Sequence, residues 1–235
     1  MSTALRPALL LFAGLLALAL NACGGGSGAT GPEVAASAGC PAAGYPEPAS
    51  AGCPGAVYPE PASAGCPGAV YPEPASSLYV LPWQPRQAIR TGLTNCSSSF
   101  HSQGRPDQFA FDFDMAAGTP FVASRGGRVS AVVNDQGSQG GGAGNYVVID
   151  HGDGSSGIYL HSPRGGIQVR AGDTVRQGQV LGISGRSGMA GYPHLHFMVV
   201  LGAAVYPYTG LPVSFRNADP PDRALRSSTV YRALP

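Results

Sequence analysis

Short hydrophobic runs alternate with turn-forming residues from about Leu78 onward. The runs are five to eight residues long, and they either alternate apolar with polar positions or are rich in β-branched residues. Gly, Asn and Asp separate them, which is typical of β-strands joined by tight turns, and no stretch has the period of an amphipathic helix. The sequence therefore predicts an all-β fold built as a compact antiparallel sheet domain. We expect strands at 109–115, 120–124, 128–134, 146–151, 157–161, 179–183 and 194–201.

Three copies of a 13-residue unit precede this domain, at residues 36–74. Each copy has one cysteine, one tyrosine and three prolines but few bulky apolar residues, so the unit is too short and too polar to bury a core of its own. We interpret 23–77 as a disordered, extended Pro/Gly/Ala linker. A repeat expansion with no role beyond length is the alternative. The domain is predicted at 78–235, with its core at about 90–216 and a polar tail after it.

The N-terminus has the pattern of an export signal. Arg6 is followed by an apolar run over 8–20, which is too short to cross a bilayer comfortably and is typical of a signal-peptide core. The run ends in LNAC at 20–23, which resembles a bacterial lipoprotein box whose cysteine becomes lipidated. The sequence thus predicts a signal peptide at 1–22, a membrane anchor at Cys23 and a location in the bacterial cell envelope. Secretion after cleavage of an ordinary signal is the alternative.

Charge and cysteine content limit the partners. The net charge is +1 and 11% of residues are charged, so no nucleic-acid partner is expected, and the oligomeric state stays open. Export would place the cysteines in an oxidising compartment. If Cys23 is lipidated, four cysteines remain for disulfides in any pairing, and none has the spacing of a structural zinc finger. These four are Cys40, Cys53, Cys66 and Cys96.

Two of the predicted strands carry groups that bind metals. The motif HLH at 194–196 opens one strand, and because strand side chains alternate, both histidines point to the same face. Two adjacent imidazoles can bind a metal ion, or one can bind it while the other transfers protons. The strand at 109–115 places its phenylalanines on one face and Asp112 and Asp114 on the other. A carboxylate beside two histidines suits zinc.

Several spaced segments resemble the lysostaphin/LytM-type zinc metallopeptidases, which cleave peptide cross-links or stem peptides of bacterial peptidoglycan. They occur in the family's order over roughly half of the chain, and several motifs agree rather than one. The resemblance implies a small antiparallel β-sheet domain with a narrow groove. The segments are 112–120 (DFDMAAGTP), 144–151 (GNYVVIDH), 159–161 (YLH), 172–182 (GDTVRQGQVLG) and 193–197 (PHLHF).

The resemblance implies zinc ligands at the positions that match the family's motifs. Asp112 occupies the place of the ligand carboxylate, and Asp114 does not. His196, the second histidine of the HLH motif, occupies the place of a ligand histidine. The third ligand is a histidine upstream of the aspartate, and His101 is the only one in that part of the chain. It stands eleven residues before the aspartate, on a segment that resembles the longer ligand loop of some relatives.

Two further histidines, His161 and His194, are implied to flank a zinc-bound water. One would take a proton as attack begins, and the other would stabilise the tetrahedral intermediate. The sequence does not tell which histidine has which role. His151 matches the family pattern at a strand end and has no metal role. We expect the glycine-rich segment 184–191 to line the groove. Tyr192 and Tyr159 are candidates for substrate contact, with core packing as the alternative for Tyr159.

These implications together predict a zinc-dependent endopeptidase that hydrolyses peptide bonds of bacterial peptidoglycan, with Zn²⁺ as cofactor and a peptidoglycan peptide as substrate. A non-catalytic cell-wall-binding or activator module of the same fold is the alternative. A tethered structural or adhesive protein would account for the repeats but not for the histidines. Glycine bridges and stem-peptide bonds are both processed within the family, so the bond that is cleaved stays open.

Overall fold

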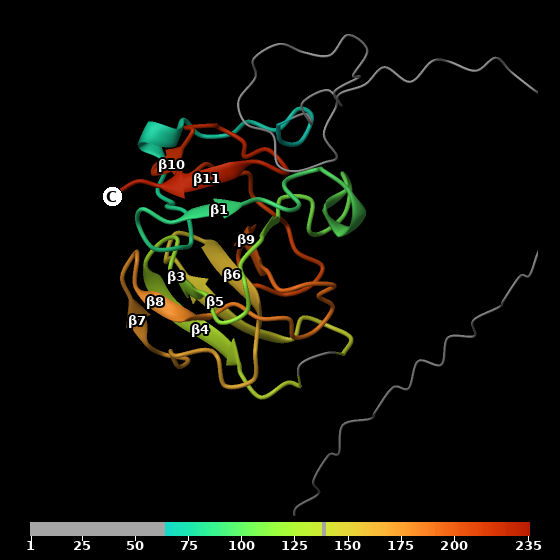
Figure 1. The fold of residues 1–235 in the computed structure, drawn as a ribbon, viewed down its shortest axis with the longest axis vertical. Coiled ribbons are helices and arrows are strands. Elements are labelled where there is room, and N and C mark those ends of the chain that lie inside the picture. The colour runs from blue at the N-terminus through green and yellow to red at the C-terminus, as the bar shows by residue number, and fades with distance from the viewer. Residues whose placement is uncertain (1–63, 138–139) are drawn as a thin grey trace, which may run out of the picture. The chain divides into compact units, whose positions relative to one another are not determined.

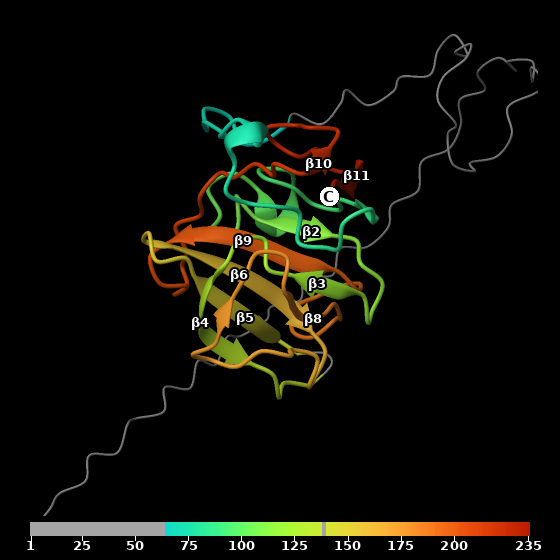
Figure 2. The same cartoon turned by 90° about the vertical axis from the view of Figure 1, so that its left-hand side faces the viewer.

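A six-stranded antiparallel sheet forms the centre of the fold (Figure 1, Figure 2). The structure is a computed structural model that describes residues 64–137 and 140–235. Neighbouring strands follow the order β2-β9-β6-β5-β4-β7. In that order the strands are β2 (Phe111–Phe113), β9 (Leu195–Leu201), β6 (Ser155–Ser162), β5 (Asn145–Asp150), β4 (Gly127–Val133) and β7 (Thr174–Val175).

Two smaller sheets flank the large one. One pairs β3 (Pro120–Val122) with β8 (Val180–Ile183), and the other has the order β1-β11-β10, with β1 (Ala88–Arg90), β11 (Val230–Ala233) and β10 (Ala218–Asp219). The helical elements of the described residues are two 3₁₀ turns, η1 (Pro74–Ser76) and η2 (Ser99–His101). Among these residues no helix is long and apolar enough to cross a membrane. The all-β prediction is confirmed, and each of the seven expected strands has a counterpart.

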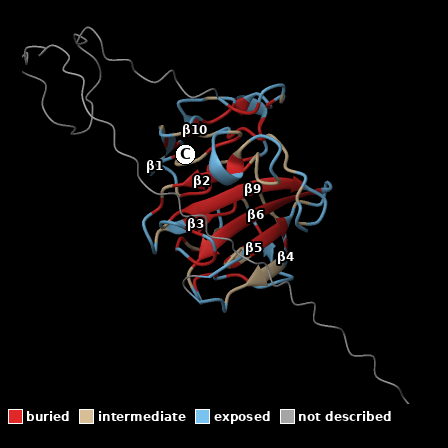
Figure 3. Ribbon diagram, turned by 90° about the vertical axis from the view of Figure 1, so that its right-hand side faces the viewer, coloured by how far each residue is buried: buried red, intermediate tan, exposed pale blue. Residues whose placement is uncertain are grey.

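Alternation along the strands separates the two faces of the large sheet. Phe111 and Phe113 of β2, with Phe197 and Val199 of β9, lie in the main hydrophobic core. Large aromatic side chains dominate this core, and their burial is the main source of its stability. The intervening positions of the same strands face the opposite side. The central strands β9, β6 and β5 are buried along most of their length (Figure 3). Other large core side chains are Leu81, Trp83, Met115, Phe121, Tyr159, Phe215 and Tyr231.

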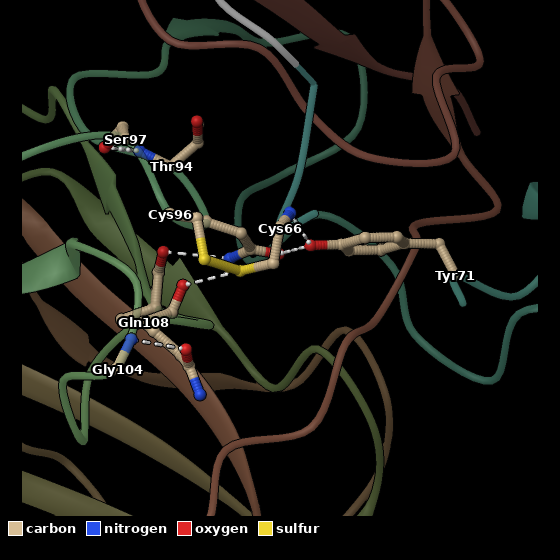
Figure 4. Close-up of a disulfide and its surroundings, with 9 residues drawn as sticks. Cys66, Tyr71, Thr94, Cys96, Ser97, Gly104 and Gln108 are labelled. Carbon is tan, nitrogen blue, oxygen red and sulfur yellow. Dashed lines mark hydrogen bonds between the residues drawn. A yellow bond between two sulfur atoms is a disulfide. The ribbon is translucent and has the colours of Figure 1, made fainter. Parts of the chain in front are cut away.

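Residues 64–74, the described part of the third repeat, pack against the domain (Figure 4). Cys66 forms a disulfide with Cys96, and the two Cα atoms are 4.9 Å apart. The Tyr71 hydroxyl accepts a hydrogen bond from the Cys66 amide and donates one to Asn95 Oδ1, each at 3.0 Å. Asn95 in turn donates to the carbonyl oxygen of Ala110 at 3.0 Å. A disulfide and a chain of buried hydrogen bonds thus hold a segment with little apolar surface.

Residues 64–77 are therefore part of the folded unit rather than of an extended linker, and the fold begins before the boundary expected at residue 78. The remaining predictions for the linker, the signal peptide at 1–22 and the lipid anchor at Cys23 fall within residues 1–63, outside the described residues.

The polar tail after residue 216 also packs on the domain. It contains β10 and β11, and β11 pairs with β1 in antiparallel register. Tyr231 is fully buried, and its hydroxyl donates a hydrogen bond to Asp222 Oδ2 at 2.6 Å and accepts one from the Arg226 amide at 2.9 Å. The folded region thus extends beyond the expected core of 90–216 at both ends.

The disulfide generates a prediction about stability. Cys66 and Cys96 are 30 residues apart, and closing a loop of that length contributes about 3–4 kcal/mol by restricting the unfolded chain. We expect Cys96→Ser to lower the free energy of unfolding by about this amount in urea denaturation. We replace Cys96 rather than Cys66, because Cys53 lies in a repeat identical to that of Cys66 and could take its place in the disulfide. Wild-type protein in reductant should lose the same amount, and unchanged stability in both cases would contradict the prediction.

Candidate metal centre and active site

Asp112 on β2, an edge strand of the large sheet, lies directly opposite His196 on the neighbouring strand β9. The register of β2 with β9 pairs them directly, and His196 Nδ1 lies 3.0 Å from Asp112 Oδ1. Their side chains are 9% and 8% exposed, so the contact is nearly shielded from solvent. Directly opposite residues on antiparallel strands have Cα atoms about 4.5–5.5 Å apart, so the register alone brings the two groups together.

His101 reaches the same carboxylate from a loop. It ends η2, its side chain is 2% exposed, and its Nε2 lies 3.3 Å from Asp112 Oδ1. Its ring is edge-on to that of His196, with the centroids 5.3 Å apart. The structure therefore brings together all three residues that the resemblance implies as ligands, including His101, which no strand pairing places there.

His161 enters the site through a β-bulge. The register of β5 with β6 shifts near Asn145, and His161 has a φ of 75°, in the left-handed region that non-glycine residues rarely adopt. Regular alternation would place His161 on the face of Tyr159, which lies in the main core. The bulge adds a residue and redirects the side chain. The ring instead lies 4.8 Å from that of His194 and 5.7 Å from that of His196, measured between centroids.

His194 completes the cluster. Its Nε2 is 3.5 Å from Asp112 Oδ1, and its Nδ1 is 2.9 Å from the carbonyl oxygen of Tyr192. His161 Nδ1 likewise lies 2.9 Å from the carbonyl oxygen of Ser187. A carbonyl oxygen can only accept, so Nδ1 carries the proton in both rings. Each Nε2 is then free to accept one.

Burial sets the charge of these two histidines. It lowers the pKa of His161 to about 3, and the neighbouring His196 and His194 act in the same direction. Burial also lowers the pKa of His194, and the opposing charge of Asp112 does not reverse the effect. Both rings are therefore neutral at physiological pH, which is the state that a proton acceptor needs.

The charge of Asp112 is maintained by its partners. Burial alone would raise the pKa of this carboxyl, but hydrogen bonds from His101 and His196 outweigh burial and hold the pKa well below its usual range. For His196, burial lowers the pKa, and the hydrogen bond and charge of Asp112 outweigh it, so that the pKa is raised. The site thus combines one ionised carboxylate with imidazoles.

Two overlapping groups of donors could hold a metal ion, His101–Asp112–His196 and His161–His194–His196, each with donor atoms within 4.8 Å of one another. Donors about 2.0–2.1 Å from a tetrahedral zinc ion lie about 3.4 Å apart. The separations of 3.0 and 3.3 Å from Asp112 Oδ1 fit this spacing, and only the first group contains a negative charge. The first group therefore fits zinc better.

Other residues considered from the sequence lie outside this cluster. Asp114 forms an ion pair with Arg90. His151 directs Nδ1 to the carbonyl oxygen of Gly126 at 2.9 Å and belongs to neither donor group. Tyr159 is fully buried in the main core, where its hydroxyl accepts a hydrogen bond from the Ser124 amide at 2.7 Å. Tyr159 therefore packs in the core, which was the alternative to substrate contact.

An open hollow of about 630 Å³ adjoins the cluster. Gly92 lies in its wall and donates a backbone hydrogen bond to the carbonyl oxygen of Asp112 at 2.7 Å. Tyr192, which is 41% exposed, lines the hollow, and its ring centroid lies 4.7 Å from that of His194. The lining residues are Arg90, Gly92, Leu93, Asp114, Met115, Ala116, Tyr192 and Pro193.

One acidic residue beside the site was not identified from the sequence. Asp107 Oδ1 lies 4.0 Å from His196 Nε2, on the side of the ring opposite Asp112. Its sequence signal is weak, because it is one carboxylate in a polar turn between His101 and Asp112.

Curated relatives cover the middle of the chain. An uncharacterized metalloprotease of Haemophilus influenzae is 38% identical over 99 residues, which are 42% of this chain and 20% of that protein. The peptidoglycan DD-endopeptidase ShyA of Vibrio cholerae is 37% identical over 110 residues, 47% of this chain and 22% of that protein. The chain thus spans about a fifth of the length of the curated relatives it matches.

The antimicrobial peptidase lysostaphin from Staphylococcus simulans is 25% identical, with a TM-score of 0.45, over 58% of this chain and 52% of that one.

The family model described as Peptidase family M23 matches residues 107–207. Asp112, His161, His194 and His196 lie inside the match, and His101 lies before it. The chain therefore contains a domain of peptidase family M23.

Proposed function

We propose that this protein is a zinc-dependent endopeptidase that hydrolyses peptide bonds of bacterial peptidoglycan. The observation that carries the proposal is the buried cluster of Asp112 with His101 and His196, next to two neutral histidines whose Nε2 atoms carry no proton. The names of relatives support the substrate class, since one of them is a peptidoglycan DD-endopeptidase. The complete donor set supports an enzyme over a non-catalytic module of the same fold.

His101, Asp112 and His196 would hold the metal. Three protein ligands leave a tetrahedral zinc ion one open position, which is the arrangement of catalytic rather than structural sites. Zinc, when bound, supplies a Lewis acid that polarises a carbonyl and lowers the pKa of water toward about 7. The ionised carboxylate of Asp112 offsets part of the metal's charge in a site that solvent hardly reaches.

His161 and His194 would handle the proton. Their Nδ1–H groups are held by the carbonyl oxygens of Ser187 and Tyr192, which fixes the ring orientation and leaves Nε2 as the acceptor. In hydrolysis one Nε2 accepts the proton of the attacking water, and that proton must later reach the leaving amine. As negative charge develops on the substrate, the second ring can take up a proton from solvent at Nε2 and donate it as a hydrogen bond to the oxyanion.

The hollow beside His194 offers space for a substrate side chain. Apolar walls from Leu93 and Met115 and the half-exposed guanidinium of Arg90 suit a short aliphatic residue in a peptide. Tyr192 lines this space and its ring lies beside that of His194, so we propose that it contacts the substrate.

We further propose that the protein acts in the cell envelope, exported through the signal peptide at 1–22 and anchored at Cys23. The disulfide between Cys66 and Cys96 supports an oxidising compartment, because structural disulfides are rare in the reducing cytosol.

Metal content tests the ligands. Asp112→Ala should abolish zinc binding, because it removes the charged donor shared by the three contacting histidines. Asp114→Ala is the matched control, since it removes a carboxylate two positions along the chain that belongs to neither donor group. Zinc per chain, measured after dialysis by atomic emission, should approach one for wild type and for the control. Equal zinc in both variants would refute the ligand assignment.

Two further variants test the proton transfers. His161→Ala and His194→Ala should keep bound zinc but lower kcat by about 10²–10⁴-fold, the usual contribution of a general acid or base. His196→Ala should lose both zinc and turnover. The measurements are zinc content and initial rates of peptide release on the same preparations. If both single variants turned over at the wild-type rate, the roles given to these rings would be wrong.

Digestion of purified peptidoglycan tests the function itself. We expect the zinc-loaded protein to release soluble fragments with new peptide termini, a chelator to stop release, and added zinc to restore it. Sacculi with glycine bridges and sacculi with direct cross-links, compared by mass spectrometry of the products, would identify the bond. A zinc-loaded protein that releases nothing from either material would leave the enzyme proposal without support.

A further inference from the structure

His196 has one ring nitrogen with no hydrogen-bond partner. Its Nδ1 contacts Asp112, but its Nε2 is buried and accepts or donates no hydrogen bond among the described residues. The side chain is 9% exposed, so solvent does not readily take the place of a protein partner. His161 and His194 differ, because the nitrogen of each that points away from the cluster contacts a backbone carbonyl.

The position of the metal determines where the proton of His196 must be. A neutral imidazole carries one proton, so a metal ion at Nδ1 requires that Nε2 hold it. Nδ1 is the nitrogen that lies 3.0 Å from Asp112 Oδ1, within the donor group of His101, Asp112 and His196. Metal binding therefore turns Nε2 into a buried N–H donor, and a buried donor without an acceptor is unfavourable.

Asp107 is the acidic group beside this nitrogen. Its Oδ1 lies 4.0 Å from His196 Nε2, and its side chain is 23% exposed. Within the described part of the chain its carboxylate makes no other ion pair or hydrogen bond, while its backbone oxygen accepts from the Ala110 amide at 2.9 Å. The backbone is thus fixed in a turn, whereas no hydrogen bond among the described residues holds the carboxylate.

We propose that Asp107 is a positioning residue for His196, whose carboxylate accepts the Nε2 proton when a metal occupies Nδ1. The distance of 4.0 Å is too long for a hydrogen bond, and a side-chain rotation in this turn would close it. Metal-ligating histidines usually donate their other ring N–H to a carboxylate or carbonyl, which orients the ring and makes the ligating nitrogen a stronger donor. The inference rests on the zinc site of the proposed function.

Zinc affinity tests this role without any measurement of activity. Asp107→Ala should weaken zinc binding by about 10–100-fold in competition with a chromogenic chelator. Asp107→Asn keeps an amide oxygen that can accept, so it should recover much of that loss. Asp135→Ala is the matched control, because it removes an exposed carboxylate and the same charge without a contact to the cluster. The thermal unfolding of the metal-free protein should be the same for all three variants.

Nuclear magnetic resonance gives a second readout. In zinc-loaded wild type with ¹⁵N-labelled histidine, we expect a slowly exchanging Nε2–H signal from His196, and in Asp107→Ala we expect it to exchange faster. Asp107→Ala that binds zinc as tightly as Asp135→Ala would overturn the inference and leave the zinc site intact. A wild-type protein that binds no zinc would overturn both the inference and the proposed function.

Discussion

The contact of one buried carboxylate with three imidazoles is the constraint on which the site depends. Asp112 Oδ1 lies 3.0 to 3.5 Å from ring nitrogens of His196, His101 and His194. An isolated buried charge is strongly unfavourable, so these neighbours are what allow the carboxylate to stay ionised. The register of β2 with β9 fixes the contact, and a slip of one residue would turn Asp112 into the core and the phenylalanines out of it. The aromatic core and the site therefore stabilise one another.

The loop that carries His101 is held by groups far away in the sequence. Between Cys96 and Ala110 it contains only a 3₁₀ turn, so no strand pairing fixes His101 or Asp107. At one end the Cys66 disulfide anchors it, and the Cys96 amide donates to the Gln108 carbonyl at 2.8 Å to close the loop on itself. The third repeat, which reads as linker, thereby supports a ligand of the candidate metal site.

Sequence alternation was enough to predict the strands, since each buried face repeats every second residue. It also placed Asp112 and His196 on the faces they occupy, whereas His101 came from the resemblance alone. The disulfide pairing could not be predicted from the sequence, because the three repeats place their cysteines in nearly identical surroundings. Only the packing of one repeat against the domain distinguishes Cys66 from the other two. Asp107 was missed for a related reason: the proximity of a loop carboxylate to a strand histidine depends on the fold of the loop, which no local pattern encodes.

His161 shows how a departure from alternation can serve the chemistry. A φ of 75° in a non-glycine residue costs of order 1 kcal/mol or more, and such strain persists only where the surroundings enforce it. Here Ser187 enforces it, because its carbonyl accepts from His161 Nδ1 while its hydroxyl bridges the Ser162 carbonyl and the Asn145 amide, at 2.6 and 2.8 Å. Ser187 lies in 184–191, the segment expected to line the groove. Under the proposed function, the same loop would contact the peptide and hold a ring that accepts the proton of the attacking water, so a single buried serine would link substrate binding to catalysis.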